Sequence, residues 1–403
     1  MSSHGNILAS SEAAPLACDF CGQRLQPRYR PDRSSRDLTV HVCPHCGLVQ
    51  SGPRVARTKD RHAAAVSGGA DWGNVRYGKG FRTRAAMDAL ARHADLDSPF
   101  ALLDVGSNRG SFARAFLDAA PQAALTALEP DERFAQSAGD LPRTKLVQAR
   151  IEDMAFADAS FDIVHSCHTI EHLASPFTTL RDHARVLKHG GLLVIDAPNI
   201  ALIGGDDIVE EWFIDKHLYH FSARTLARMI TAAGFSIIEQ ADPADAINLL
   251  FVARKTGRTS TTAAADLAEV QQADCLLGRY RQTRAGNLAA LSRAARDLAA
   301  LAPRRIALWG AGRLFDLLVT EGSFDPSQLT LLIDTHLKQH MDSRHGVALS
   351  TPEALRQTPV DTIVVMSRGF AAEITAEARR LAPKAEIILY SDLLTRARLQ
   401  PAA

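Results

Sequence analysis

The sequence predicts an α/β protein in three parts: a small metal-binding domain, a central sheet covered by helices, and a second α/β domain. Three observations support this prediction. Short apolar runs alternate with amphipathic stretches from Phe100 onward, the pattern of a parallel sheet with helices on both faces. Two Cys-x2-Cys pairs precede this region. A second apolar run followed by a glycine loop begins at Arg304.

The composition is that of a globular protein with substantial cores. Of 403 residues, 46% are apolar and 23% are charged. The net charge of +1 gives no electrostatic footprint for nucleic acid or for an acidic membrane surface. The sequence has neither an apolar run of membrane-spanning length nor a secretory signal pattern. We therefore expect a cytoplasmic protein that binds neither nucleic acids nor membranes.

The N-terminal region predicts a structural zinc site. Residues 1–14 are small and polar and are expected to form a disordered lead. Residues 15–58 are expected to form a zinc-binding domain, because each Cys-x2-Cys places two thiolates on one turn and two such turns complete a tetrahedral site. In a reducing compartment such pairs favour metal over disulfide. The expected ligands are Cys18, Cys21, Cys43 and Cys46.

A glycine-rich turn after the first central strand predicts a site for a nucleoside-containing cofactor. Residues 101–105 form the expected strand, and Gly106 and Gly110 let the backbone bend and a ligand approach it closely. The following helix N-terminus offers free N–H groups to an electronegative ligand group. Glu129 ends the next strand, where an acidic side chain suits a ribose diol.

The run Asp104-Val-Gly-Ser-Asn-Arg-Gly110 resembles the first motif of class I S-adenosylmethionine (SAM)-dependent methyltransferases, in the form found in nucleotide-sugar C-methyltransferases. The resemblance implies SAM as cofactor. It also implies a class I methyltransferase Rossmann-like sheet, preceded by the small zinc-binding domain and followed by a second Rossmann-like α/β domain. The cofactor contacts that it implies here are Asp104, Gly106, Ser107, Asn108, Gly110, Glu129 and Pro130.

Residues 59–258 are expected to form the methyltransferase domain. The predicted strands are 101–105, 124–129, 144–149, 161–166 and 192–196. The predicted helices are about 110–119, 131–138, 175–188 and 222–233, with Gly190 and Gly191 ending the third of them. Two further strands near 235–240 and 247–254 are joined by a short polar loop, which predicts an antiparallel hairpin at the sheet edge.

Later segments extend the resemblance, which covers about residues 75–255. The runs 161–173 and 187–199 resemble later motifs of the family. By this resemblance the adenine and the sulfonium lie near further contacts, namely Ile151, Glu152, Cys167 and His168. Glu171 lies with His168 just past the same strand, near the expected place of the sulfonium. Tyr77 and Arg84, which precede the first central strand, stay open between a cofactor contact and simple packing.

A competing pattern lies in the same region. His168-Thr-Ile-Glu171-His172 formally matches H-x-x-E-H, the motif of inverted zinc proteases. Those enzymes carry the motif inside a long helix, whereas here it follows the end of a strand. The sequence therefore favours a structural role for His172 over a catalytic zinc site.

The insert at residues 200–221 is expected to hold the substrate. The run 213–226 resembles a segment of nucleotide-sugar C-methyltransferases in which a histidine is the proposed base, and His217 takes that position. Its neighbours depart from the family pattern, since Asp215-Lys216 replaces His-Glu and Tyr219-His220 replaces Ser-Tyr. The candidate catalytic residues are His217, Tyr219, His220 and His168.

The favoured function is C-methylation of a keto nucleotide-sugar with His217 as general base, since a histidine suits the removal of a proton next to a carbonyl. An O- or N-methyltransferase for a polysaccharide or secondary metabolite is the alternative, because small-molecule O-methyltransferases place a similar segment here. An RNA methyltransferase is less favoured on charge grounds. The expected partner is a small-molecule substrate, and the sequence leaves the oligomeric state open.

The last third of the chain predicts a helical linker at 259–302 and a second Rossmann-like domain at 303–403. Its first strand leads into Gly310-Ala-Gly312. Phe315 occupies the third position of the dinucleotide fingerprint, which argues against NAD. The loop either holds a nucleotide diphosphate or is a packing turn, and the sequence leaves both possibilities open.

Overall fold

The computed structural model describes residues 16–31, 38–52, 80–132, 139–214, 217–242, 248–259 and 263–399. The chain divides into two compact units. The first contains the described residues up to Cys275 except for Leu202–Trp212, here named the strap. The strap belongs to the second unit, together with Leu276 and the residues after it. The predicted lead, Tyr77 and most of the predicted helix at 131–138 lie outside the described residues.

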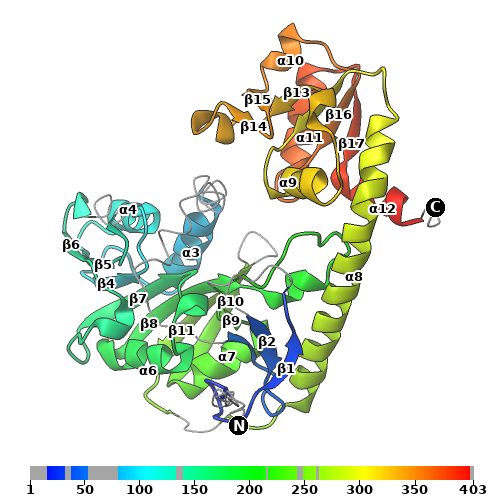
Figure 1. The fold of residues 1–403 in the computed structure, drawn as a ribbon. Coiled ribbons are helices and arrows are strands. Elements are labelled where there is room, and N and C mark those ends of the chain that lie inside the picture. Colours follow the sequence, from blue (N-terminus) through cyan, green and yellow to red (C-terminus); the bar gives the residue numbers. More distant parts are fainter. Residues whose placement is uncertain are drawn as a thin grey trace, which may run out of the picture. The chain divides into compact units, whose positions relative to one another are not determined.

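A seven-stranded sheet forms the centre of the first unit, with strand order β10-β11-β8-β7-β4-β5-β6 (Figure 1). Strands β8, β7, β4, β5 and β6 run parallel, and β11 and β10 form an antiparallel hairpin at one edge. The predicted alternation and the edge hairpin are confirmed. The bounds are β4 Ala101–Val105, β5 Ala124–Leu128, β6 Thr144–Val147, β7 Phe161–Cys167, β8 Leu187–Pro198, β10 Phe235–Ala241 and β11 Asn248–Lys255.

Helices cover both faces of this sheet because neighbouring strand residues point to opposite sides. Leu102 joins the apolar cluster of α3 (Phe81–Ala91) and α4 (Ser111–Ala119). The next residue, Leu103, joins the cluster of α6 (Pro176–Val186) and α7 (Ala223–Ala232). Local signals fix the ends of the last two helices. The Ser175 side chain caps α6, and Ser222 forms a capping box with Thr225 at the start of α7.

One predicted boundary is wrong. The helix expected at 175–188 ends at Val186, and β8 begins at once with Leu187. Gly190 has a φ of 75°, but it lies inside β8 rather than at the helix end. The pairing of β7 with β8 is irregular between Phe161 and Ile163, so the two glycines belong to an irregular start of the strand.

A small four-stranded sheet combines the cysteine-containing segment with a distant part of the chain. Its order is β1-β2-β3-β9 and its strands are antiparallel. The bounds are β1 Gln26–Tyr29, β2 Thr39–Val42, β3 Val49–Gly52 and β9 Tyr219–His220. The insert that contains His217 is therefore tied to the cysteine-rich segment through β9.

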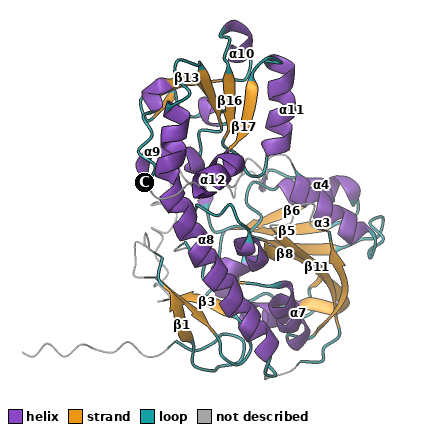
Figure 2. Ribbon diagram, turned by 90° about the vertical axis from the view of Figure 1, so that its right-hand side faces the viewer, coloured by secondary structure: helices purple, strands orange, loops and turns teal. Residues whose placement is uncertain are grey.

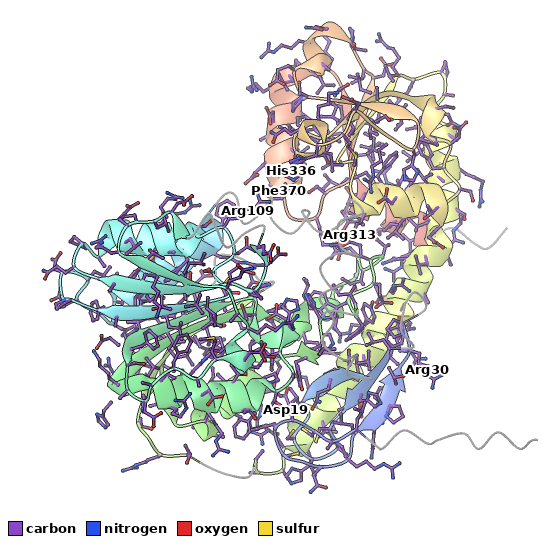
Figure 3. All side chains as sticks on the ribbon, turned by 60° about the vertical axis from the view of Figure 1, so that its left-hand side comes forward. Asp19, Arg30, Arg109, Arg313, His336 and Phe370 are labelled. Atoms are coloured by element: carbon purple, nitrogen blue, oxygen red, sulfur yellow. The ribbon has the colours of Figure 1, made fainter. Side chains whose placement is uncertain are left out.

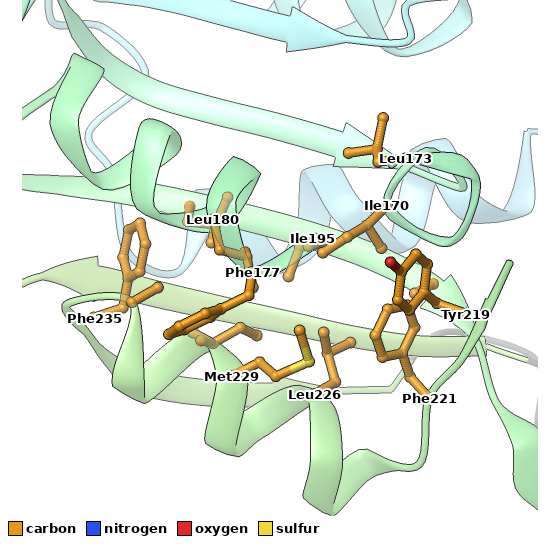
Figure 4. Close-up of a cluster of buried hydrophobic side chains, with 14 of the residues drawn as sticks. Ile170, Leu173, Phe177, Leu180, Ile195, Tyr219, Phe221, Leu226, Met229 and Phe235 are labelled. Atoms are coloured by element: carbon orange, nitrogen blue, oxygen red, sulfur yellow. The ribbon is translucent and has the colours of Figure 1, made fainter. Parts of the chain in front are cut away.

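The largest apolar cluster lies between the central sheet, α6 and α7 (Figure 4). Phe177, Leu226 and Met229 fill the space beneath Ile195 of β8. Tyr219 and Phe221 close one end of the cluster, with their rings 6.4 Å apart. Each large side chain buried in this way stabilises the fold by about 1.5–3 kcal/mol.

Burial of His183 in α6 makes stability depend on pH. The side chain is 2% exposed, and burial lowers its pKa to about 4. The pKa of this histidine in the unfolded chain is about 6.5. Between that pH and about pH 4 only the unfolded state takes up the proton, so the free energy of unfolding falls by about 1.4 kcal/mol for each pH unit of acidification. Between pH 7 and pH 5, we expect the free energy of unfolding of His183→Leu to fall by about 2 kcal/mol less than that of the wild type. Urea unfolding at both pH values measures this difference, and parallel profiles would contradict it.

The second unit contains a six-stranded sheet of order β14-β15-β13-β12-β16-β17 (Figure 2). All neighbours are parallel except β14 and β15. The strands are β12 Ile306–Trp309, β13 Leu329–Ile333, β14 Ser343–Arg344, β15 Val347–Ser350, β16 Thr362–Val365 and β17 Glu386–Leu389. The helices are α9 Arg313–Thr320, α10 Ala354–Gln357, α11 Ala371–Leu381 and α12 Tyr390–Leu399. The 33-residue helix α8 (Leu267–Ala299) precedes them.

The glycine loop of the second unit has a packing reason of its own. Gly310 has a φ of 110°, and a Cβ added there would lie 2.6 Å from the carbonyl oxygen of Met366. Glycine at this position therefore does not by itself indicate a nucleotide. Arg313 begins α9, and His336 and Phe370 directly precede η6 (Leu337–Gln339) and α11; Figure 3 labels all three at one end of this sheet. Among the described residues, no helix combines the length and the apolar character that a membrane span needs.

Candidate functional site

The loop after β4 packs closely against the segment after β7. Gly106 and Gly110 both have a φ of 74°, a left-handed conformation that favours glycine. A Cβ added at Gly106 would lie 2.2 Å from Oγ1 of Thr169. The Thr169 hydroxyl donates to the carbonyls of Val105 and Cys167, at 3.2 and 3.1 Å. Gly106 is therefore required for this contact, whether or not a ligand approaches the loop.

Two buried polar atoms beside the loop have no hydrogen-bond partner. Asp104 is 1% exposed, and its Oδ1 lies 2.7 Å from Nδ1 of His165, whereas its Oδ2 has no partner. The Ser107 hydroxyl is also buried without a partner. Leaving such a group unsatisfied costs about 1–3 kcal/mol. These atoms fit a site that a polar ligand completes.

Glu129 directly follows β5 and holds the loop that follows the neighbouring strand β4. Its carboxylate accepts hydrogen bonds from the backbone N–H groups of Asn108 at 2.8 Å and Asp131 at 2.9 Å. Burial raises the pKa of Glu129. The structure gathers the predicted cofactor contacts of the first motif at the carboxyl ends of two adjacent strands; they are Asp104, Gly106, Ser107, Asn108, Gly110, Glu129 and Pro130.

The remaining predicted cofactor contacts occupy the next strand ends. Ile151 and Glu152 lie in η2 (Ile151–Asp153), after β6. Ile151 is buried, and the Glu152 carboxylate accepts a hydrogen bond from the backbone N–H of Ala174 at 3.1 Å. Cys167 ends β7, and burial raises the pKa of its thiol.

Arg84 lies in α3 with its guanidinium carbon 4.9 Å from the ring centre of Phe81.

His168 follows β7 in a strained backbone conformation, with a φ of 47°. Non-glycine residues in this region cost of order 1–3 kcal/mol and cluster at functional sites. Its Nε2 lies 2.7 Å from Oδ1 of Asn248 and 3.1 Å from Oδ1 of Asp196. These partners come from β11 and β8, so three adjacent strand ends meet at His168.

A buried carboxylate lies between His168 and two further histidines. Glu171, in η3 (Ile170–His172), has its Oε1 3.4 Å from Nδ1 of His168 and 3.6 Å from Nε2 of His172. The ring centres of His172 and His217 are 4.8 Å apart. We name these four residues the Glu171 cluster. The structure thus brings His168 and His217, two of the predicted catalytic residues, to one carboxylate.

Tyr219 and His220 lie elsewhere, within β9. The Tyr219 hydroxyl donates to the carbonyl of Ala174 at 2.9 Å, and its ring is buried in the apolar cluster. Nε2 of His220 lies 2.8 Å from the Ser51 hydroxyl, and burial lowers the His220 pKa to about 3. These contacts hold β9 against β3 and the core. A catalytic role for either residue stays a prediction.

Comparison with known proteins agrees with this geometry. A family model described as a methyltransferase domain matches residues 103–195. The chain contains a methyltransferase domain. Its sheet, with a parallel order and an antiparallel edge hairpin, has the class I SAM-dependent fold that the sequence predicted.

Similar proteins share the methyltransferase domain over a limited length. An uncharacterized methyltransferase of Mycobacterium leprae is 39% identical over 97 residues, 23% of this chain and 35% of that protein. A probable S-adenosylmethionine-dependent methyltransferase of Mycobacterium tuberculosis is 35% identical over 95 residues, 23% of this chain and 34% of that protein. The chain therefore spans about a third of the length of these relatives.

The solved structures that resemble this chain are more distant in sequence. An S-adenosylmethionine-dependent methyltransferase from Mesorhizobium loti is 18% identical, with a TM-score of 0.36, and the match covers 42% of this chain and 98% of that chain. A complex of the Haloferax volcanii Trm112 methyltransferase activator with a methyltransferase gives 20% identity and a TM-score of 0.41, and the match covers 51% and 100% of the two chains.

The four predicted metal ligands in front of the methyltransferase domain converge on one point. The Sγ atoms of Cys18 and Cys46 are 3.5 Å apart, and those of Cys21 and Cys43 are 3.4 Å apart. All four sulfur atoms lie within 4.8 Å of one another. The two Cys-x2-Cys turns therefore form a single four-cysteine cluster, a possible metal site.

The sequence analysis did not select Asp196 or Asn248 as site residues. Both face His168, and each is a buried polar residue beside apolar neighbours near one end of its strand. That signal could have identified them, because buried polar side chains at strand ends mark the ligand edge of a parallel sheet. The sequence placed Glu171 with His168 just past the same strand, but it gave no local sign that the Glu171 carboxylate is buried.

The contact at Gly106 gives a direct test of the cofactor site in the methyltransferase domain. We expect Gly106→Ala to weaken SAM binding at least about tenfold, because the new methyl group displaces Thr169 and strains a left-handed residue by about 1–2 kcal/mol. Gly257 has the same φ of 74° with nothing within 4 Å of an added Cβ, so Gly257→Ala is the matched control. Titration calorimetry measures both, and equal SAM affinity in the two variants would contradict the assignment.

Proposed function

We propose that this protein transfers a methyl group from SAM to a small molecule, and that the acceptor is a carbon atom of a keto nucleotide-sugar. The observation that carries the proposal is the position of the Glu171 cluster. Its histidines and its buried carboxylate lie just past β7, next to the glycine loop of the methyltransferase domain. Forming a carbon nucleophile requires a base that removes a proton next to a carbonyl, and imidazole suits that task.

The residues around the glycine loop fit SAM. Gly106 admits close approach to the backbone, and Oδ2 of Asp104 and the hydroxyl of Ser107 are buried polar atoms in need of partners. Glu129 offers a carboxylate at the next strand end, where a ribose diol is expected. SAM supplies a methyl group activated by a positively charged sulfur. The chain contributes mainly orientation and exclusion of water from the reacting atoms.

Within the cluster we assign the base to His217. Nε2 of His168 already faces Asp196 and Asn248. His217 is half-buried, and its backbone N–H donates to the Ile214 carbonyl at 3.0 Å. The proton leaves the substrate carbon for the His217 imidazole, and the electron pair of the broken C–H bond stays on that carbon for attack on the methyl group.

We also propose that the four cysteines bind zinc in a structural role. Tetrahedral zinc with Zn–S bonds of about 2.3 Å separates its sulfur ligands by about 3.8 Å, close to the distances in the cluster. Four thiolates leave no open position for a reacting water molecule. Zinc here would replace the core that a short segment cannot build by itself.

The function is tested with methyl-labelled SAM and a panel of thymidine- and uridine-diphosphate sugars, each as the 4-keto and the 4-hydroxy form. We expect label only in a 4-keto sugar, with the new methyl group on the carbon next to the carbonyl. With S-adenosylhomocysteine in place of SAM, the proton on that carbon should exchange with deuterated water. A methyl ether or methylamine product, or no exchange, would contradict C-methylation and favour the O- or N-methyltransferase alternative.

A further inference from the structure

The carboxylate of Glu171 has an unusual environment for a charged group. Its side chain is fully buried, with 0% exposure, and neither carboxylate oxygen has a hydrogen-bond partner. Its backbone carbonyl accepts a hydrogen bond from the N–H of Leu218 at 2.9 Å, which ties η3 to the residue after His217. A buried carboxylate is costly unless an opposite charge or strong donors compensate it.

Imidazoles are the groups that face this carboxylate. Oε1 of Glu171 lies 3.4 Å from Nδ1 of His168 and 3.6 Å from Nε2 of His172. The nearest atoms of Glu171, His172 and His217 all fall within 4.8 Å of one another. These separations are slightly too long for hydrogen bonds and short enough for strong attraction to an imidazolium ion.

The charges around the cluster favour a positive charge on the histidine pair. His168 lies between two carboxylates, with its Nδ1 3.4 Å from Oε1 of Glu171 and its Nε2 3.1 Å from Oδ1 of Asp196. Arg82 of α3 acts on Cys167 from another side of the same region. Of the two carboxylates, that of Glu171 also lies beside His172 and His217.

We propose that Glu171 is the positioning residue for proton removal: its carboxylate stabilises one proton shared by His172 and His217. The proposal rests on the function proposed above. When His217 takes the proton from the substrate carbon, the imidazole pair becomes an imidazolium that Glu171 compensates. The electron pair left on the substrate carbon forms its bond to the methyl carbon of SAM. The bond between the methyl carbon and sulfur breaks, and sulfur keeps the electrons of that bond.

A substrate-free measurement tests this assignment. The full-length, zinc-replete protein is labelled with carbon-13 in its histidine rings, and the ring signals are followed from about pH 5 to about pH 9. His172→Gln and His217→Gln assign the two signals. In the wild type at least one should titrate above the ordinary midpoint of about 6.5. In Glu171→Gln that midpoint should fall by about one pH unit, a tenfold loss of proton affinity.

Glu239→Gln is the matched control. Glu239 lies on the edge strand β10, with its Oε2 2.6 Å from Nε2 of His93, so it is a carboxylate beside a histidine outside the Glu171 cluster. This variant should leave the signals of His172 and His217 unchanged. Glu171→Asp keeps the charge and should retain a raised midpoint, which a purely steric role would not predict.

Two results would overturn the proposal. One is a midpoint of both His172 and His217 at or below 6.5 in the wild type, a measurement that needs no Glu171 variant to fold. The other is a second metal ion per chain that Glu171→Gln removes, which would make the cluster a cation site instead of a proton site. Both readouts are independent of methyl transfer. A failed substrate panel with the predicted titration would therefore refute the proposed function and leave the shared proton standing.

Discussion

Replacing Cys43 with serine is expected to remove the bound metal and to unfold the small sheet. Cys43 is 0% exposed and lies within 3.4 Å of the Cys21 thiol, so serine leaves three thiolates around a site built for four. Structural zinc sites contribute about 10 kcal/mol or more to the folding of such segments. Metal analysis should give about one zinc per wild-type chain and none in the variant. Thermal unfolding should show a loss of stability far larger than that of an ordinary surface substitution.

The control for this variant is Cys275→Ser. Cys275 is exposed and lies in α8, outside the four-cysteine cluster. It should keep both the metal and the wild-type melting temperature. Retention of zinc and unchanged melting in Cys43→Ser would show that the cluster is not a structural metal site.

His217→Ala is expected to lower kcat about 10²–10⁴-fold and to leave SAM affinity unchanged. The reason is that His217 lies beside His172 in the Glu171 cluster, whereas the proposed SAM contacts lie at the ends of β4 and β5. Turnover with the sugar identified in the panel and calorimetry with SAM measure the two quantities separately. A loss confined to kcat distinguishes a base from a residue that only shapes the cofactor site.

His189→Ala is the matched control for His217→Ala. His189 is exposed on β8, so its removal should change neither quantity. Near-wild-type turnover of His217→Ala would remove His217 from the reaction and leave His172 as the remaining candidate base in the cluster.

The sequence predicted the parts of the site that depend on local pattern. Gly106, Gly110 and Glu129 fall at fixed distances from strand ends. The crossover connections between parallel strands bring such ends to one edge of the sheet. The two cysteine pairs were recognisable for the same reason, since each pair is a single turn. Local spacing is enough when the chemistry is contained in one turn or at one strand end.

The rest depended on contacts between distant segments. The pairing of β9 with β3 joins His220 to Val49, and two residues of β9 carry little pattern that could announce it. Asn248 reaches His168 only because β11 lies next to β8 in the sheet. Glu171 becomes important through burial, and burial of a polar residue is set by tertiary packing rather than by its neighbours in sequence.

The strap makes the two units hard to separate by genetic means. Val209 is 1% exposed within the apolar cluster of the second unit, and Asp207 and Glu210 each lie 3.2 Å from Arg368. A chain truncated after α8 would expose Val209 to solvent. It would also leave Asp207 and Glu210 without the guanidinium of Arg368. Only residues 213–216 separate the strap from His217. Deleting the last hundred or so residues would therefore loosen the peptide that leads to the proposed base, so a catalytic fragment has to keep the C-terminal domain.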